Sequence, residues 1–241
     1  MLPYKLERVL FVILWIAILC IFSFAIPPQS ITPPVQYQYV VTSLFLALLL
    51  FFIYRKVSNR IMVKKIKAFI FKNDAEAGLA YVSKAIQRQP RFGWLKVKKL
   101  ELLFIKGDIC GYQTFRTMLF CKDHAWMNYV ALLDNVMGFL TQGKFDPSVT
   151  PCNLDIERSL LGKTNHLLCE RDTLPHDTLV MLTSILYHSS IPIYRCIASL
   201  IMSMHYQKTG DTNNKTLYYE EAIRTAPSAE ITQCVKSICK E

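Results

Sequence analysis

The pattern of hydrophobic and polar positions changes abruptly at Tyr54. Before it lie two runs without a charged residue, Val9 to Ile26 and Tyr37 to Tyr54, each 18 residues long. As a helix, each run would reach about 27 Å, close to the roughly 30 Å hydrocarbon core of a bilayer. Backbone polar groups in lipid must pair within their own segment, so we predict transmembrane helices. Residues 1–56 are therefore expected to form a transmembrane hairpin with spans at about 9–26 and 37–54.

The first run has a second interpretation, as a cleaved signal peptide. Lys5 and Arg8 precede it, and the small residues Ser23 and Ala25 resemble a cleavage site. Its 18 residues exceed the usual hydrophobic region of such a peptide, about 7 to 15 residues. We therefore expect a retained span.

Beyond Tyr54 the apolar residues recur at helical spacing, and turn signals divide the chain into helices. The turn pairs Asn73-Asp74 and Gly107-Asp108 are 34 residues apart. Alternating strand patterns with hairpin turns are absent. We predict an all-α chain, with further turns at Gln142-Gly143 and Gly210-Asp211 and further helices at 154–170, 176–188 and 229–240.

The stretch from Ile197 to Pro227 resembles a tetratricopeptide repeat (TPR). The match rests on Gly210-Asp211, Tyr219, Ala222 and Pro227, and upstream on Asn73-Asp74, Gly78, Ala85 and Pro90. The small residue usual midway along each first helix is replaced by Ile66, Leu100 and Val136, and only Ser203 is small. The resemblance implies a TPR-like α-solenoid of about four degenerate helix pairs over residues 57–241. An irregular helical domain is the alternative.

Charge is concentrated next to the second run. Residues 55–108 hold 14 Lys and Arg against 4 Asp and Glu, a net charge of +10, whereas residues 109–241 hold 12 against 13. The loop between the runs carries no charge, so the positive-inside rule places both termini in the cytoplasm of a multi-pass protein, which suits a bacterial inner membrane. We expect anionic lipid headgroups, and no nucleic acid, to bind Arg55, Lys56, Arg60, Lys64 and Lys65.

Motifs for catalysis or cofactor binding are not found. The chain has no GxGxxG, GxxxxGK, HExxH or GxSxG sequence. The fragments Cys121-x-x-His124 and His166-x-x-Cys169 would supply four zinc ligands only if they met in space. We expect free thiols, no metal, no cofactor and no enzymatic activity.

The function that we expect is a membrane-anchored adaptor or scaffold that binds a protein partner through its tail. The resemblance implies an inner groove built from first helices, and these are mainly apolar, which favours an apolar helix or peptide over a terminal carboxylate. The same stripe could instead be core. An alternative function is a small structural subunit of a larger membrane assembly, recognised through its spans. The groove residues selected are Lys67, Phe71, Trp94, Glu101, Phe104, Met204 and Gln207.

The overall plan is also similar to that of two-span membrane proteins with tetratricopeptide tails associated with bacterial haem synthesis. No motif in this chain transfers that role.

Overall fold

The computed structural model describes residues 4–25, 33–90, 92–119, 124–143, 146 and 174–238. These residues form ten α-helices and no strand, which confirms the all-α prediction for the described part of the chain. The chain divides into two compact units: the first unit is Met1–Lys67 with Lys84–Pro90, and the second unit is Ala68–Ser83 with Arg91–Glu241.

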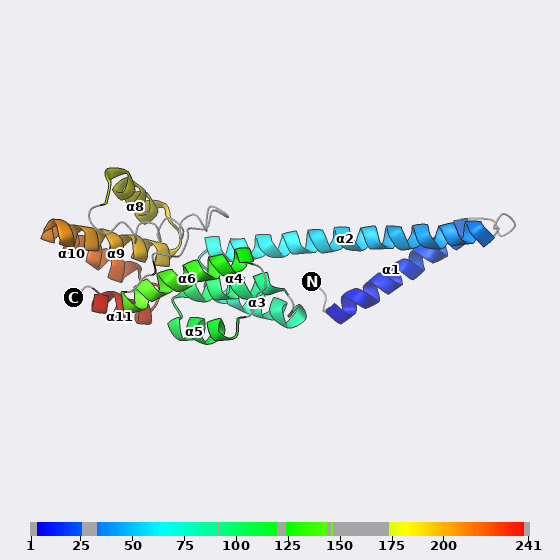
Figure 1. The fold of residues 1–241 in the computed structure, drawn as a ribbon, viewed down its shortest axis with the longest axis horizontal. Coiled ribbons are helices and arrows are strands. Elements are labelled where there is room, and N and C mark those ends of the chain that lie inside the picture. The colour runs from blue at the N-terminus through cyan, green and yellow to red at the C-terminus, as the bar shows by residue number, and fades with distance from the viewer. Residues whose placement is uncertain are drawn as a thin grey trace. The chain divides into compact units, whose positions relative to one another are not determined.

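The first unit contains α1 (Tyr4–Ala25) and most of α2 (Pro33–Phe71), two helices that run antiparallel (Figure 1). Phe11 on α1 meets Phe51 on α2 edge to face, with ring centroids 5.4 Å apart. Buried side chains include Ile18 on α1 and the small residues Ser43 and Ala47 on α2. Small residues four positions apart allow helices to approach closely, as in membrane helix pairs.

The helix α2 continues past the predicted domain boundary at residue 56. It has 39 residues, and neither Gly nor Pro lies between Tyr37 and Phe71. The Lys and Arg residues that follow Tyr54 are good helix formers, so polarity changes there without a break in the backbone. The first predicted helix of the tail is therefore the end of α2, and the compact first unit extends to Lys67.

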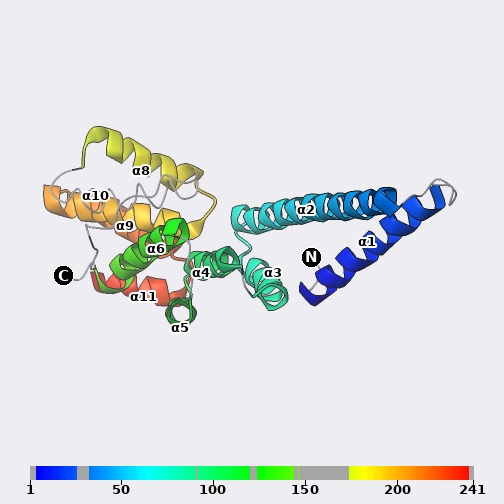
Figure 2. The ribbon, with the colours of Figure 1, turned by 45° about the vertical axis from the view of Figure 1, so that its right-hand side comes forward.

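The second unit is a stack of helices (Figure 2). α9 packs most extensively against α10 and α8, α11 packs against α6, and α4 contacts α5, α6 and α9. The helix bounds are α3 (Ala75–Arg88), α4 (Gly93–Lys106), α5 (Ile109–Thr117), α6 (His124–Gln142), α8 (His176–His188), α9 (Pro192–Thr209), α10 (Thr212–Thr225) and α11 (Ala229–Ile238).

In the described residues, Gly143 follows α6 with a φ of 63°, and three other helices end in one shared left-handed turn. Asn73, Gly107 and Gly210 have φ values of 53°, 71° and 80°. In each turn the following Asp donates its backbone N–H to a carbonyl five residues back, the Schellman pattern that satisfies the last carbonyls of a helix. These bonds are Asp74 to Phe69 (2.9 Å), Asp108 to Leu103 (3.1 Å) and Asp211 to Tyr206 (3.0 Å).

The same aspartates begin the next helices. The side chains of Asp74, Asp108 and Asp211 accept hydrogen bonds from the backbone N–H groups of Ala77, Gly111 and Asn214, at 3.1, 2.7 and 3.1 Å. This is N-capping, which stabilises a helix by about 1 kcal/mol. The bonds to Asn214 lower the pKa of Asp211 below its usual range. The sequence prediction of turns at these three positions is confirmed.

A long-range contact ties the α4–α5 turn to the start of α11. Ser228 Oγ donates to the Gly107 carbonyl at 2.7 Å, and the Ile109 N–H donates to Glu230 Oε2 at 3.0 Å. Residues 121 apart in sequence are thereby joined. Glu230 places its carboxylate at the N-terminus of α5, where the helix dipole favours negative charge.

A polar contact joins α5 to α6. The Tyr112 hydroxyl donates to Asp134 Oδ1 and Arg116 Nε donates to Asp134 Oδ2, both at 2.7 Å. Burial, with a smaller contribution from the Asp134 carboxylate, raises the pKa of Tyr112 far above its usual range. Tyr112 therefore remains a hydrogen-bond donor throughout the physiological pH range.

Substituting Gly107 tests the packing of the α4–α5 turn against the start of α11. A Cβ there would lie 2.8 to 2.9 Å from Pro227, Ile231 and Ser228, whereas one at Gly210 would meet nothing within 4 Å. Both positions need φ above zero, so Gly210→Ala should cost about 1 kcal/mol of unfolding free energy. Gly107→Ala should cost at least about 1 kcal/mol more, because it also overpacks the contact. Urea unfolding of the full chain in nanodiscs measures both, and equal losses would contradict the tight packing.

Candidate functional site

The first candidate surface is the apolar exterior of the first unit. α2 over Val41–Phe71 is long and apolar enough to cross a membrane, and only 11% of its apolar stretch is buried. In the described part of the chain it is the one helix that passes this test. The apolar segment Val9–Ile21 of α1 is shorter. The predicted Ile26 end of the first span lies outside the described residues.

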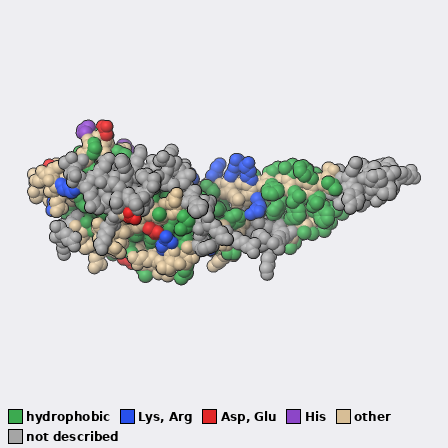
Figure 3. Space-filling model, in the orientation of Figure 1, with side chains coloured by type: hydrophobic (Ala, Val, Ile, Leu, Met, Phe, Trp, Pro, Cys, Tyr) green, Lys and Arg blue, Asp and Glu red, His purple; other side chains and the backbone are tan. Residues whose placement is uncertain are grey.

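The exposed apolar side chains of α2 cover most of its circumference, apart from the buried face of Ser43 and Ala47. Phe45 and Phe52 are 67% and 65% exposed on one face, where Leu49 is also exposed, and Leu46 and Leu50 are exposed on the neighbouring face. A helix with so wide an apolar surface belongs in a protein core or in lipid, and most of this surface is not covered by the described residues. Figure 3 shows the apolar surface, followed by basic side chains.

The predicted headgroup-binding residues follow this apolar stretch on α2. Lys56, Arg60, Lys64 and Lys65 are exposed, and Arg55 is half-buried. Lys56, Arg60 and Lys64 recur at intervals of four and lie on one face of the helix. The geometry is that of a basic strip at the end of a span.

The predicted groove residues do not form one exposed surface. Phe104 is fully buried and Glu101 is 1% exposed, so neither presents a side chain to a partner. Phe71 is 58% exposed at the end of α2, and Gln207 is exposed near the end of α9. The remaining three, Lys67, Trp94 and Met204, are half-buried.

Glu101 belongs to a buried polar group on α4. Its Oε2 lies 2.5 Å from Lys98 Nζ, and Lys98 lies over the Tyr129 ring at 6.0 Å. Both charges are almost completely buried, where removing one partner would leave the other uncompensated. The structural role of this pair explains Glu101, one of the two charged residues of the predicted groove.

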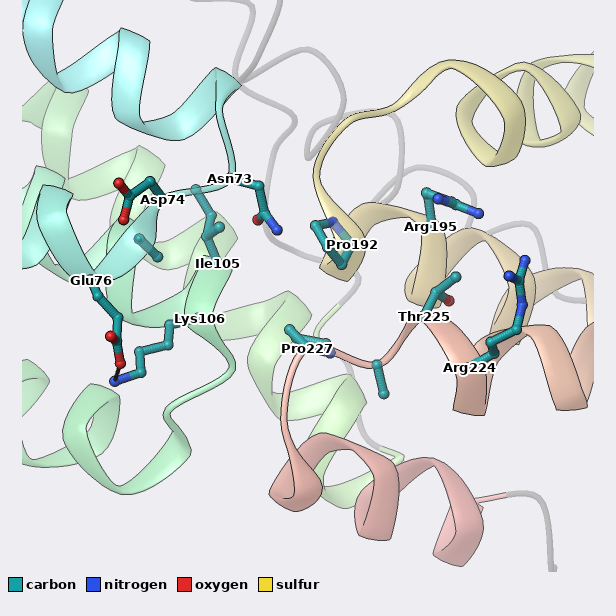
Figure 4. A pocket seen from close by; sticks show the side chains of 12 residues that line it. Asn73, Asp74, Glu76, Ile105, Lys106, Pro192, Arg195, Arg224, Thr225 and Pro227 are labelled. Atoms are coloured by element: carbon teal, nitrogen blue, oxygen red, sulfur yellow. Dashed lines mark ion pairs between the residues drawn. The ribbon is translucent and has the colours of Figure 1, made fainter.

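The second candidate site is a pocket of about 570 Å³ in the second unit (Figure 4). The ends and starts of four helices surround it, and one of the repeated turns, Asn73-Asp74, contributes. Pockets of this volume hold small ligands or parts of larger ones. The lining residues are Asn73–Glu76, Ile105 with Lys106, Pro192 with Arg195, and Arg224–Pro227.

Two arginines and one carboxylate define the charged end of the pocket. Arg224 donates from Nε and Nη2 to both oxygens of Glu221, at 2.7 and 2.8 Å. Arg195 Nη2 donates to Glu221 Oε1 at 3.2 Å. Figure 4 shows Arg195 on α9 and Arg224 on α10 extending toward one another. One carboxylate therefore bridges two guanidinium groups and leaves one positive charge in excess.

The opposite end of the pocket carries two carboxylates and one ammonium group, a net charge of −1. Lys106 Nζ pairs with Glu76 Oε1 at 3.0 Å, and Asp74 caps α3 through the Ala77 N–H. The surplus positive charge of the pocket consequently lies at Arg195 and Arg224.

Sequence reasoning missed this pocket. Glu221 and Arg224 are three residues apart, a spacing that predicts a helical ion pair and no site. Arg195 belongs to another helix, and no local pattern places it beside them. Only packing of α9 on α10 brings the three charges together.

The metal hypothesis finds no supporting cluster in the described residues, where no three His, Cys, Asp or Glu side chains could hold an ion. Cys121, His166 and Cys169 lie outside those residues. Comparison of the chain with protein-family models, with curated proteins and with solved structures finds no match.

Proposed function

We propose that this protein is a membrane-anchored helical adaptor, held by a two-span hairpin with both termini in the cytoplasm. The observation that carries the anchoring is the exposed apolar surface around α2 between Val41 and Ile53. At about 25 cal/mol per Å², leaving that surface in water would be strongly unfavourable, and lipid removes the cost. The basic strip from Arg55 then marks the cytoplasmic end.

The second span is supported by the antiparallel contact of α1 with α2. The Phe11–Phe51 ring contact and the buried Ile18, Ser43 and Ala47 indicate a packed helix pair. Antiparallel helices joined by a short uncharged loop return the chain to the side on which it began. The hairpin therefore keeps the basic ends of both spans on one side of the bilayer.

The adaptor role is supported by the repeated turn and by the open pocket. Three Schellman turns followed by an Asp cap join successive helices, and two of them are 34 residues apart, the length of the tetratricopeptide repeat that we propose for the tail. Stacks of such pairs characteristically bind polypeptides. We assign the tail to binding a partner protein and give it no catalytic role.

A second candidate function is a structural subunit recognised through the spans. Phe45 and Phe52, seven residues apart and both largely exposed, lie on one face of α2 and could pack against another membrane helix. The two functions differ in which part of the chain carries recognition.

Exchanging the hairpin separates these functions. A chain in which residues 1–54 are replaced by an unrelated two-span hairpin should retain its cross-linked partners if the tail recognises them. Loss of every partner, with the chain still in the membrane, would favour the subunit role. Reporter fusions at residues 31 and 241 test the topology, which requires the first outside and the second inside the cytoplasm.

A further inference from the structure

The pocket between the α2–α3 turn and the α9–α10 pair contains an arginine, Arg195, with hydrogen-bond donors that have no acceptor in the described part of the chain. Arg195 has five N–H donors and makes one hydrogen bond in the described part of the chain, the 3.2 Å contact with Glu221. Its Nε is buried and has no hydrogen-bond partner there. The side chain as a whole is 34% exposed, whereas Nε is enclosed, so binding at Nε requires the guanidinium group to turn toward the pocket.

Glu221 shows which chemistry fits this end of the pocket. Its carboxylate accepts two donors from Arg224 at 2.7 and 2.8 Å and a third, longer bond from Arg195. Arg224 therefore satisfies Glu221 without help. If a second carboxylate bound Arg195 through Nε and Nη2, the buried donor would be satisfied in the side-on, two-bond geometry that guanidinium favours. Glu221 would lose only the longest of its contacts.

We propose that this pocket binds an acidic side chain of a polypeptide partner, with Arg195 as the main donor. The proposal rests on the adaptor function and names the chemical class that the adaptor recognises. The excess of one positive charge over Glu221 supplies the attraction at the arginine end. At the opposite end Lys106 offsets Glu76 but not Asp74, so the remaining negative charge directs the acidic side chain toward Arg195. The 570 Å³ volume accommodates neighbouring residues of the partner segment.

Binding of two matched peptides tests this assignment. One capped octapeptide carries two central glutamates, and its counterpart carries two glutamines at the same positions. Fluorescence anisotropy with the full chain in uncharged phosphatidylcholine nanodiscs should show the glutamate peptide binding at least 10-fold more tightly. Arg195→Gln should weaken that binding at least 10-fold. Arg195→Lys keeps the charge and loses the two-bond geometry. Its affinity for the glutamate peptide should therefore lie between that of wild type and that of Arg195→Gln.

Lys236→Gln on α11 is the matched control, since it removes one exposed positive charge outside the pocket. It should leave binding within 2-fold of wild type. Equal binding of the two peptides, or an Arg195→Gln effect no larger than the control's, would overturn the proposal. Competition by inorganic phosphate as strong as that by the glutamate peptide would overturn the carboxylate assignment. Cross-linked partners that survive both the hairpin exchange and Arg195→Gln would leave the adaptor function standing without this site.

Discussion

The Phe104→Ala variant should unfold with a free energy about 3 to 5 kcal/mol below that of wild type, because a fully buried aromatic side chain leaves a cavity. Phe71→Ala removes the same atoms from a side chain that is 58% exposed and should cost less than about 1 kcal/mol. The two variants distinguish a core residue, Phe104, from a surface residue, Phe71. Both residues were predicted from the sequence to line one groove.

Urea unfolding of the full chain in nanodiscs, followed by tryptophan fluorescence, measures both variants. Trp94 and Trp126 report on the second unit, and Trp15 lies in the first. Similar losses in the two variants would contradict the burial of Phe104. A change in partner cross-linking by Phe71→Ala at unchanged stability would instead identify Phe71 as a contact residue.

The Leu49→Arg variant should lose much of its membrane integration. Leu49 lies within the predicted second span and is exposed along α2. An arginine near the centre of a spanning helix disfavours insertion by about 2.5 to 3.5 kcal/mol, while the lost leucine removes a favourable contribution. The fraction of chain that resists carbonate extraction from membranes should therefore fall.

Leu217→Arg is the control for this experiment. Leu217 is 58% exposed on α10, in the second unit, and its substitution should leave extraction unchanged. Unchanged extraction of Leu49→Arg would show that α2 is covered by protein and would contradict the anchoring proposal.

The helices of the second unit were predictable because local signals mark their ends. Asp caps and left-handed residues stand at the turns, and the prediction of 176–188 coincides with α8. The predicted helix 229–240 begins at Ala229 as α11 does, and residues 239–241 lie outside the described part, as does the predicted helix 154–170. Cap residues are informative because they satisfy backbone groups within a few residues of sequence.

The candidate site was not predictable because it depends on distant packing. An apolar stripe at helical spacing is the same whether it faces a groove or a neighbouring helix, and Phe104 with Glu101 proved to be buried. Likewise, Arg195 meets Glu221 across 26 residues of sequence. The basic residues after Tyr54 mark the end of the predicted second span, whereas the left-handed Asn73 marks the end of the helix α2. The end of the predicted span and the end of the helix are therefore at different residues.

The contact of Ser228 and Glu230 with the α4–α5 turn has a consequence for biosynthesis. At about 5 to 20 residues per second, the ribosome needs roughly 6 to 24 seconds to make the 121 residues that separate Gly107 from Ser228. Throughout that interval the Gly107 carbonyl and the first N–H of α5 lack these native partners. The nascent second unit therefore completes its fold late, after the hairpin has left the exit tunnel, and a chain shortened before Ser228 leaves the turn without them.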